Sequence, residues 1–485
     1  MPTNYTIEQL KNMGVYNLRE LARKLGVKAP TTKKVDELID AIMSADPDSA
    51  PPTKRTAGRP PKSSMPATQT VEESQEEVEI VVEDIPKKTH EPKTDEQKKQ
   101  DILLALKDAE EREGIFEPHP DGGYGFLRTD RSGEQNQDTD AYVSQSQIKK
   151  FNLRFGDEIK ARVKVDKNNS GKSAPVISID LINGMPAEEV ADRAHFDDLV
   201  PLYPDQRYRL EIKGTSNDLA VRCIDLVAPI GKGQRGMIVS PPKAGKTTIL
   251  KQIAHSISVN YPDTELYVLL IDERPEEVTD MQRSIRGEVV YSTFDETAQH
   301  HIRCAEWLLE RAKRRVEMGK DVVILLDSLT RLARAYNVEV QSSGKILSGG
   351  VDPVALHHPK RFFGAARNIE GDGSLTIIAT ALVETGSRMD EVIYEEFKGT
   401  GNMEIHLERS LSERRIFPAI SLSRSSTRRE EMLLDPVERE GMWAVRRMLD
   451  SDVVENTERL LYMIDKAPTN KDFLINLSNQ MNTKK

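Results

Sequence analysis

Residues 240–250, with the sequence SPPKAGKTTIL, carry the residue types of a phosphate-binding loop. The usual pattern G-x-x-x-x-G-K-[ST] has glycine where this chain has Ser240, and the two prolines that follow have no N–H to donate. The second half of the loop still offers consecutive N–H groups at the start of a predicted helix, whose dipole favours an anion. The residues expected to bind the nucleotide are Lys243, Ala244, Gly245, Lys246, Thr247 and Thr248.

The chemistry implied is that of Mg²⁺-ATP. The ammonium group of Lys246 suits the β- and γ-phosphates, and the hydroxyl of Thr247 suits Mg²⁺. The apolar stretch DVVILLD at 321–327 ends in Asp327, which at a strand end can reach the metal through water. This second signal argues against a Gly-Lys-Thr turn that binds nothing.

The apolar stretch ELYVLLIDE at 265–273 ends in acidic residues, and a carboxylate there can polarise the attacking water. We take Glu273 as this base, a role usually worth ~10²–10⁴-fold in rate. Spacing alone does not rank Glu273 above Asp272, Glu276 and Glu277.

A second set of chemical groups is aromatic. Six of the 25 aromatic residues fall between positions 116 and 155, namely Phe116, Tyr124, Phe126, Tyr142, Phe151 and Phe155. In YGFLR the strand period of two places Tyr124, Phe126 and Arg128 on one face and Leu127 on the other. Rings exposed beside cations can stack on the bases of single-stranded nucleic acid, while the cations follow the phosphates. The alternative is that the rings fill a small barrel, which we expect for Phe151 and Phe155.

The elements that position these groups are predicted to form a multidomain α/β protein. Short strand signals at 124–129, 140–148, 157–165 and 174–182 are typical of a small OB-type barrel over residues 101–185. A connector follows at 186–215. Apolar strands then alternate with long helical stretches over 216–485, as in a RecA-like domain with a mainly parallel sheet.

The first hundred residues differ in composition. Residues 1–45 have helical spacing of apolar residues and are predicted to form a small helical module. Residues 46–100 are rich in Pro, Ser, Thr, Glu and Lys and lack aromatic residues, so a disordered linker is expected. Within it, KRTAGRPPK at 54–62 resembles a DNA minor-groove hook, which would imply a weak DNA contact, although only one copy is present and Ala57 replaces the arginine usual before the glycine.

Composition limits the compartment. The chain has 485 residues, a formal net charge of −10 and two cysteines, Cys223 and Cys304, whose spacing indicates neither a disulfide framework nor a metal site. The N-terminus lacks a signal-peptide pattern, and apolar runs such as VVILL at 322–326 are too short to span a bilayer. We therefore expect a cytoplasmic protein with no membrane partner.

Several longer stretches closely resemble the bacterial transcription termination factor Rho family, from about Gly114 to the C-terminal region. They are the PPKAGKT loop, SSGKILSGGVDPVAL at 342–356, GDGSLTIIATAL at 371–382 and DEVIYEEFKGTGNMEIHLERSLSERRIFPAI at 390–420. The phosphate loop of that family also lacks the first glycine, which accounts for Ser240. The resemblance implies an RNA-dependent ATPase and helicase that forms a homohexameric ring. It also implies that the protein binds pyrimidine-rich single-stranded RNA on its barrels and acts on the RNA polymerase elongation complex.

The resemblance also implies residue roles. Tyr124, Phe126, Arg128 and Tyr142 match the primary RNA site. Arg274 matches the charge network of the ATP site, Arg415 and Arg428 match arginines that reach a neighbouring subunit's nucleotide, and Phe417 matches the ring packed on adenine. Lys345 matches the pore loop that contacts moving RNA, with EGDGS at 370–374, including Gly373, as its partner.

One departure from the family is that no aromatic residue lies between Phe155 and Phe196, so base preference is left open. Two other classes of protein share parts of the pattern. A rotary ATP synthase subunit or a DNA recombinase has the phosphate loop and Asp327 but no use for base-stacking rings. A nucleic-acid scaffold with a decayed ATP site is disfavoured because Lys246, Thr247 and Glu273 retain usable chemistry.

Overall fold

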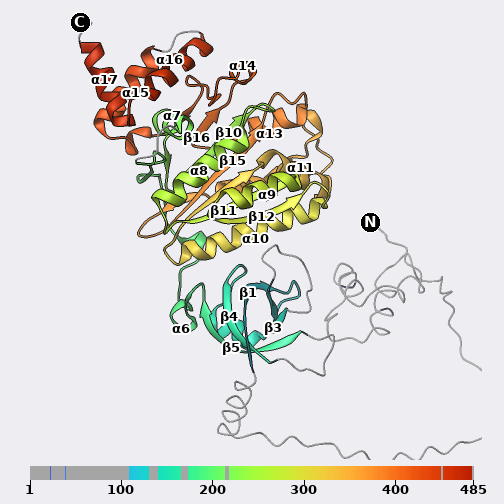
Figure 1. Cartoon of the computed structure of the whole chain (residues 1–485). Helices are drawn as coiled ribbons and strands as arrows, with labels where there is room; N and C mark the ends of the chain where they lie inside the picture. The colour runs from blue at the N-terminus through green and yellow to red at the C-terminus, as the bar shows by residue number, and fades with distance from the viewer. Residues whose placement is uncertain are drawn as a thin grey trace, which may run out of the picture. The chain divides into compact units, whose positions relative to one another are not determined.

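A computed structural model shows the path of the 485-residue chain (Figure 1). It describes Ala22, Ile39 and residues 109–129, 140–164, 173–213, 218–448 and 452–482. Ala22 and Ile39 are helical and buried. The rest of the helical module expected over 1–45, the linker expected over 46–100 and the basic segment 54–62 lie outside the described residues.

The first described domain is a closed barrel in the strand order β3-β2-β1-β4-β5-β6, with β3 also pairing with β5. Its strands are β1 (Glu110–Pro118), β2 (Gly125–Arg128), β3 (Ala141–Val143), β4 (Glu158–Val163), β5 (Ala174–Ile182) and β6 (Met185–Pro186). The barrel closes tightly because Gly125 has no side chain: a Cβ there would lie 2.4 Å from the Phe116 ring. The OB-type barrel predicted from the strand signals is confirmed.

One local prediction in the barrel was wrong. The strand expected over 140–148 ends at Val143, and residues 145–151 form the helix α5 (Gln145–Phe151). The reason is a capping box, in which the Ser144 side chain accepts from Gln147 N and the Gln147 side chain accepts from Ser144 N.

The second domain is built on a mainly parallel sheet in the order β12-β11-β13-β15-β10-β16-β17. The strands from β12 to β16 run parallel, β17 and β14 are antiparallel additions, and β7 of the expected connector pairs with β14. These strands are β7 (Pro201–Leu202), β10 (Arg235–Ser240), β11 (Glu265–Glu273), β12 (Glu288–Thr293), β13 (Asp321–Asp327), β14 (Arg367–Ile369), β15 (Ser374–Leu382), β16 (Met403–His406) and β17 (Ser426–Thr427).

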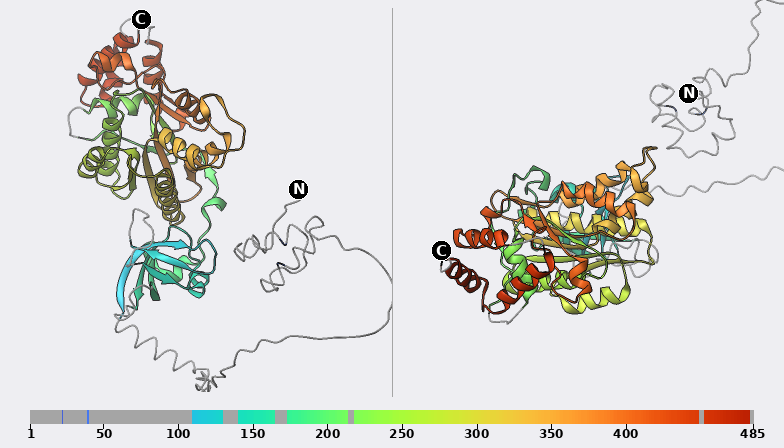
Figure 2. Two further views of the ribbon diagram at one scale, coloured as in Figure 1. Left: turned by 90° about the vertical axis from the view of Figure 1, so that its right-hand side faces the viewer. Right: turned by 90° about the horizontal axis from the view of Figure 1, so that it is seen from above.

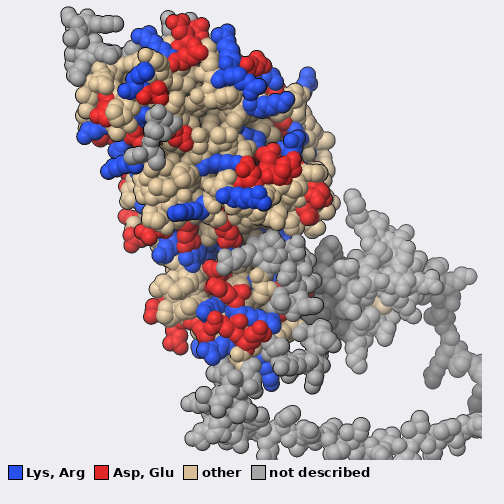
Figure 3. All heavy atoms as spheres, in the orientation of Figure 1, with Lys and Arg blue, Asp and Glu red and all other residues tan. Residues whose placement is uncertain are grey.

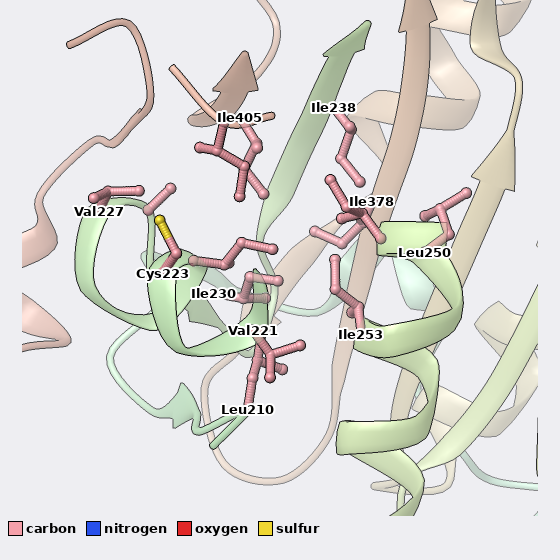
Figure 4. Packing of buried hydrophobic residues seen from close by; sticks show 14 of the residues in the cluster. Leu210, Val221, Cys223, Val227, Ile230, Ile238, Leu250, Ile253, Ile378 and Ile405 are labelled. Carbon is pink, nitrogen blue, oxygen red and sulfur yellow. The ribbon is translucent and has the colours of Figure 1, made fainter. Parts of the chain in front are cut away.

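Helices cover both faces of this sheet (Figures 1 and 2), and residues along each strand alternate between two cores. One core packs α7 (Leu219–Val227), α8 (Lys246–Asn260) and α9 (Pro275–Ser284) against the sheet. Figure 4 shows Leu250 and Ile253 of α8 facing Ile238 and Ile378 of the sheet. The other core packs α10 (Ala298–Glu317), α11 (Leu329–Glu339), α12 (His357–Gly364) and α13 (Arg388–Lys398). The predicted RecA-like architecture is confirmed.

Three C-terminal helices extend the first core, and short elements join the rest. The C-terminal helices are α15 (Pro436–Met448), α16 (Val453–Asp465) and α17 (Asn470–Asn482). The short elements are α6 (Ala187–Val190), η1 (Phe196–Asp198), β8 (Arg207–Tyr208), β9 (Ile230–Gly231), η2 (Ser348–Gly350), η3 (Pro353–Leu356), α14 (Arg409–Glu413) and η4 (Glu430–Met432). Among the described helices, none has the length and apolar character needed to cross a bilayer.

A buried carboxylate joins the barrel to the sheet domain. The Glu317 side chain, at the end of α10, is fully buried and pairs with Arg154 of the barrel at 2.9 Å and with Arg193 at 3.0 Å. Arg314 adds a third contact at 2.9 Å. Gly156 lets the barrel backbone approach α10, since a Cβ there would lie 2.5 Å from the Glu310 carbonyl carbon.

The two aromatic residues expected in the barrel core have different surroundings. Phe151 lies in the barrel core as expected, but Phe155 contacts Trp307 of α10 instead.

We predict that Glu317→Ala destabilises this junction by about 3–5 kcal/mol, because the substitution leaves three largely buried guanidinium groups without their shared anion. Trp307 reports on the junction if Trp443, the other tryptophan, is replaced by Phe. Urea unfolding followed by Trp307 fluorescence measures the loss. Asp180→Ala is the control, because its pair with Arg162 is exposed and worth at most about 1 kcal/mol. An equal effect of both substitutions would contradict the prediction.

Candidate nucleotide site and nucleic-acid interface

The phosphate-binding loop joins β10 to α8. Ser240 is buried at the strand end, and its hydroxyl donates to the Pro241 carbonyl at 2.8 Å. Lys243 (φ 65°) and Gly245 (φ 92°) both adopt left-handed conformations. The helix begins at Lys246, so the N–H groups of the second half of the loop converge there, as the sequence predicts.

Lys246 lies between two buried carboxylates at the carboxyl ends of neighbouring strands. Its ammonium nitrogen is 2.9 Å from Glu273 Oε1 and 2.6 Å from Asp327 Oδ2. Thr380 of β15 donates to the other oxygen of Asp327 at 2.7 Å. Burial alone would lower the pKa of Lys246, but the charges of Asp327 and Glu273 raise it above its ordinary value. The predicted lysine and both predicted carboxylates therefore meet in one site.

The structure separates Glu273 from the other acidic residues beside it. Glu273 is 2% exposed and contacts Lys246, whereas Glu276 is exposed on α9. Glu277 lies 3.5 Å from the Thr247 hydroxyl, and burial, together with the charge of Glu273, raises the pKa of its carboxyl group. Glu273 thus has the shielded position that a water-activating carboxylate needs.

Arg331 is a site residue that sequence reasoning missed. Its guanidinium lies 3.4 Å from Glu273 Oε2 and donates to the Asp272 carbonyl oxygen. One signal in the sequence could have found it. Arg331 lies four residues after Asp327, and a helix that follows a strand begins at the edge of the sheet where that strand ends.

A cavity of about 460 Å³ opens beside the loop. It is lined by Lys243, Ala244, Gly245 and Thr248 from the loop, by Phe417, and by Asp218 near the start of α7, which sequence reasoning also missed. The Phe417 ring is close to the loop, since a Cβ on Gly245 would lie 3.9 Å from it. The cavity therefore has the Phe417 ring and the start of α8 in its wall.

The three other predicted arginines are exposed. Arg274 caps the start of α9, next to Glu273 in the chain, and Arg415 and Arg428 lie on later segments. The described residues that line the cavity include neither Arg415 nor Arg428.

The barrel carries four rings in mutual contact, which we call the aromatic platform: His119, Tyr124, Phe126 and Tyr142. The Tyr124 ring centroid lies 4.5 Å from His119, 5.8 Å from Phe126 and 5.6 Å from Tyr142. Leu127 is fully buried, whereas Phe126 of β2 and Tyr124 just before it are partly exposed, in agreement with the alternation that the sequence predicts. His119 is an addition that lay outside the strand pattern, in the turn after β1.

Arg128 lies beneath the platform and is ion-paired with two carboxylates. Its guanidinium is 4.9 Å from the Phe126 centroid and pairs with Glu117 at 2.7 Å and with Asp140 at 2.5 Å. Burial would lower the pKa of Arg128, but the hydrogen bonds that its guanidinium donates to Asp140 and Glu117 raise it. Asp140 and Glu117 are further residues at this site that the sequence pattern did not reveal.

The two predicted pore residues occupy separate turns. Lys345 is exposed in the segment before η2, where Asp352 accepts hydrogen bonds from Ser343 N at 2.6 Å and from its hydroxyl at 2.9 Å. Gly373 (φ 95°) precedes β15, and a Cβ there would lie 3.0 Å from the Val316 carbonyl oxygen. Only glycine fits this turn easily.

Charges of both signs are mixed on one face of the molecule (Figure 3). On the face drawn in Figure 3, Lys and Arg side chains lie beside Asp and Glu side chains over the described residues. Stacking at the platform is therefore the stronger indication of nucleic-acid binding than a basic surface.

Comparisons with known proteins match both domains. Residues 112–188 match the family model for the Rho termination factor RNA-binding domain, and residues 220–427 match that for the nucleotide-binding domain of the ATP synthase alpha/beta family. The transcription termination factor Rho of Bacillus subtilis is 54% identical over 361 residues, which cover 74% of this chain and 83% of the relative. The Rho protein of Neisseria gonorrhoeae is 57% identical over 363 residues, covering 74% and 86%. That of Haemophilus influenzae is 54% identical over 385 residues, covering 78% and 91%.

With identity of this level across the barrel and the sheet domain together, the chain belongs to the family of Rho transcription termination factors.

Proposed function

We propose that this protein is an ATP-hydrolysing RNA translocase that terminates transcription. The observation that carries the proposal is the presence in one chain of the aromatic platform and of the Lys246–Glu273–Asp327 site. A rotary ATP synthase subunit would share the second site but needs no base-stacking rings. The direct test is the ATPase rate with poly(C), poly(U), poly(A) and single-stranded DNA, where stimulation by RNA is expected.

The phosphate loop binds the triphosphate through its N–H groups and Lys246. As the ammonium turns toward the β- and γ-phosphates, Glu273 gives up one of its cationic partners and becomes free to orient water. Arg331 remains beside Glu273 and holds that carboxylate in place. Phe417 packs on the adenine, and Arg274 contributes charge at the same edge of the sheet.

The donor set of the site fits Mg²⁺. The Thr247 hydroxyl and the carboxylates of Asp327 and Glu277 are oxygen ligands, which this hard cation prefers. Thr247 and Asp327 would hold it, Asp327 partly through water. Bound there, it would neutralise charge on the phosphates.

The remaining assignments concern the assembly. We assign Arg415 and Arg428 to a neighbouring subunit's nucleotide in a homohexamer, a role supported by their exposure. Lys345 and Gly373 are assigned to contacts with RNA in the pore. We further propose that the protein acts on the RNA polymerase elongation complex in the cytoplasm. Residues 54–62 would add a weak contact with DNA.

Glu273→Gln should lower RNA-stimulated ATPase by ~10²–10⁴-fold, because an amide cannot accept the proton of the attacking water. Lys246→Ala should abolish turnover. RNA affinity measured without nucleotide should stay unchanged in both variants, since the platform is on the other domain. Glu276→Gln is the matched control, being exposed on the same edge. Turnover of Glu273→Gln within twofold of the parent protein would remove Glu273 from the base role.

Tyr124→Ala with Phe126→Ala should weaken single-stranded RNA binding by roughly 2–6 kcal/mol, two stacked bases at ~1–3 kcal/mol each. Trp443→Ala, which removes an exposed ring from α15, should have no effect. Fluorescence anisotropy with labelled RNA measures the affinity, and circular dichroism checks the barrel. Unfolding of the barrel would show that the rings serve packing instead.

Mixing Arg428→Ala subunits with Lys246→Ala subunits should restore ATPase, because some interfaces then pair an intact loop with an intact arginine. An arginine supplied by a neighbour is worth roughly 10³–10⁵-fold in rate, so the gain is easily measured. Mixed rings must first be verified by native mass spectrometry. Activity no higher than that of either variant alone would contradict the role in trans.

A further inference from the structure

Glu117 of β1 joins the aromatic platform to the sheet domain. Its carboxylate accepts from Arg128 Nε at 2.7 Å and pairs with Arg303 Nη2 of α10 at 2.9 Å. The side chains of Glu117 and Arg303 are 17% and 21% exposed, so the pair is largely shielded from water. One carboxylate therefore holds two guanidinium groups that belong to different domains.

The Arg128 side of this bridge lies against the platform, with 8% of the Arg128 side chain exposed. Its guanidinium is 4.9 Å from the Phe126 ring centroid, so a nucleotide stacked on Phe126 comes close to it. Base oxygens and phosphates compete with carboxylates for arginine donors. RNA that takes a hydrogen bond from Arg128 leaves Glu117 to be held mainly by Arg303.

The Arg303 side leads to the catalytic edge. Two residues earlier on α10, His301 Nδ1 lies 2.6 Å from the Ser292 hydroxyl of β12. Phe294, just after β12, donates its N–H to the Glu273 carbonyl at 3.1 Å. Because β12 pairs with β11 beside Glu273, the start of α10 and the backbone of Glu273 form one hydrogen-bonded unit.

We propose that Glu117 and Arg303 are positioning residues that couple single-stranded RNA on the aromatic platform to the geometry of Glu273. The inference rests on the proposed function, since it presupposes RNA binding and ATP hydrolysis. Coupling requires that RNA interact differently with two states of the protein, and competition for Arg128 supplies that difference. By linkage, ATP must then change the affinity for RNA by the same factor as RNA changes the affinity for ATP.

The test uses the full chain, a labelled five-nucleotide oligocytidylate and the non-hydrolysable analogue AMPPNP. The ratio of oligocytidylate affinities with and without AMPPNP measures the coupling. In Arg303→Gln we expect this ratio to move toward one by roughly 2- to 30-fold, with nucleotide-free affinity within about twofold of the parent. Arg303→Lys, which keeps the charge, should recover part of the ratio. In the double variant Glu117→Gln/Arg303→Gln, the ratio should move no closer to one than it does in Arg303→Gln alone.

Arg162→Gln is the matched control, since it removes a barrel cation whose pair with Asp180 is exposed. A parent ratio of one, an unchanged ratio in Arg303→Gln, or equal loss of affinity with and without AMPPNP would each overturn the role of Arg303. If Arg303→Gln does not fold, the folded Arg303→Lys protein is tested in its place. A ratio of oligocytidylate affinities equal to one in Arg303→Lys would then count against the inference. Failure of the parent protein to bind the oligonucleotide or to hydrolyse ATP would overturn the proposed function itself.

Discussion

Charge pairing at the carboxyl ends of β11 and β13 organises the sheet domain. Asp327 is fully buried and Glu273 nearly so, and an unpaired carboxylate at such depth would be strongly unfavourable. The ammonium of Lys246 neutralises both, which requires that α8 begin directly above these two strands. The parallel order of the sheet meets this requirement, because neighbouring parallel strands end at the same edge. The same pairing keeps the lysine charged and poised beside the loop before a phosphate arrives.

The barrel is joined to this domain by charge as well as by packing. α10 carries Glu317 at one end, buried among arginines, and Arg303 near the other end, paired with Glu117. Its first turn is hydrogen-bonded to β12 through Ser292. A single helix of 20 residues therefore contacts the barrel at two places and the catalytic edge of the sheet at its start. Such a helix transmits displacement well, because its backbone hydrogen bonds resist bending.

The platform reconciles RNA binding with a chain whose formal net charge is −10. Stacking on rings is largely insensitive to net charge, so a few aromatic residues can bind bases without a wide basic surface. The positive charge of Arg128 beside the platform is itself balanced by neighbouring carboxylates. Its two carboxylate partners hold the guanidinium beside Phe126 and limit its attraction to any anion that does not also reach the ring.

Motifs local in the chain were readable without coordinates. The strand and helix patterns were sufficient for the fold class, and the loop at 240–250 together with Asp327 was sufficient for the nucleotide site. Spacing did not distinguish Glu273 from its acidic neighbours. The alternation in YGFLR was sufficient to place its rings on the face opposite Leu127. The roles of Arg415, Arg428 and Lys345 came from family resemblance and stay predictions. Short-range polar signals were misread where they compete with strand patterns, as in the capping box at Ser144.

Long-range pairing was decided by the tertiary structure alone. Asp218, Asp140 and Glu117 belong to the sites, yet nothing in their local sequence distinguishes them from solvated charges. Glu273 stands apart from Asp272 and Glu276 only through burial, which depends on helices packed from elsewhere in the chain. Phe155 lies against Trp307 although the two are 152 positions apart. Periodicity and spacing report on a residue's own element, whereas burial and ion pairing depend on which other elements pack against it.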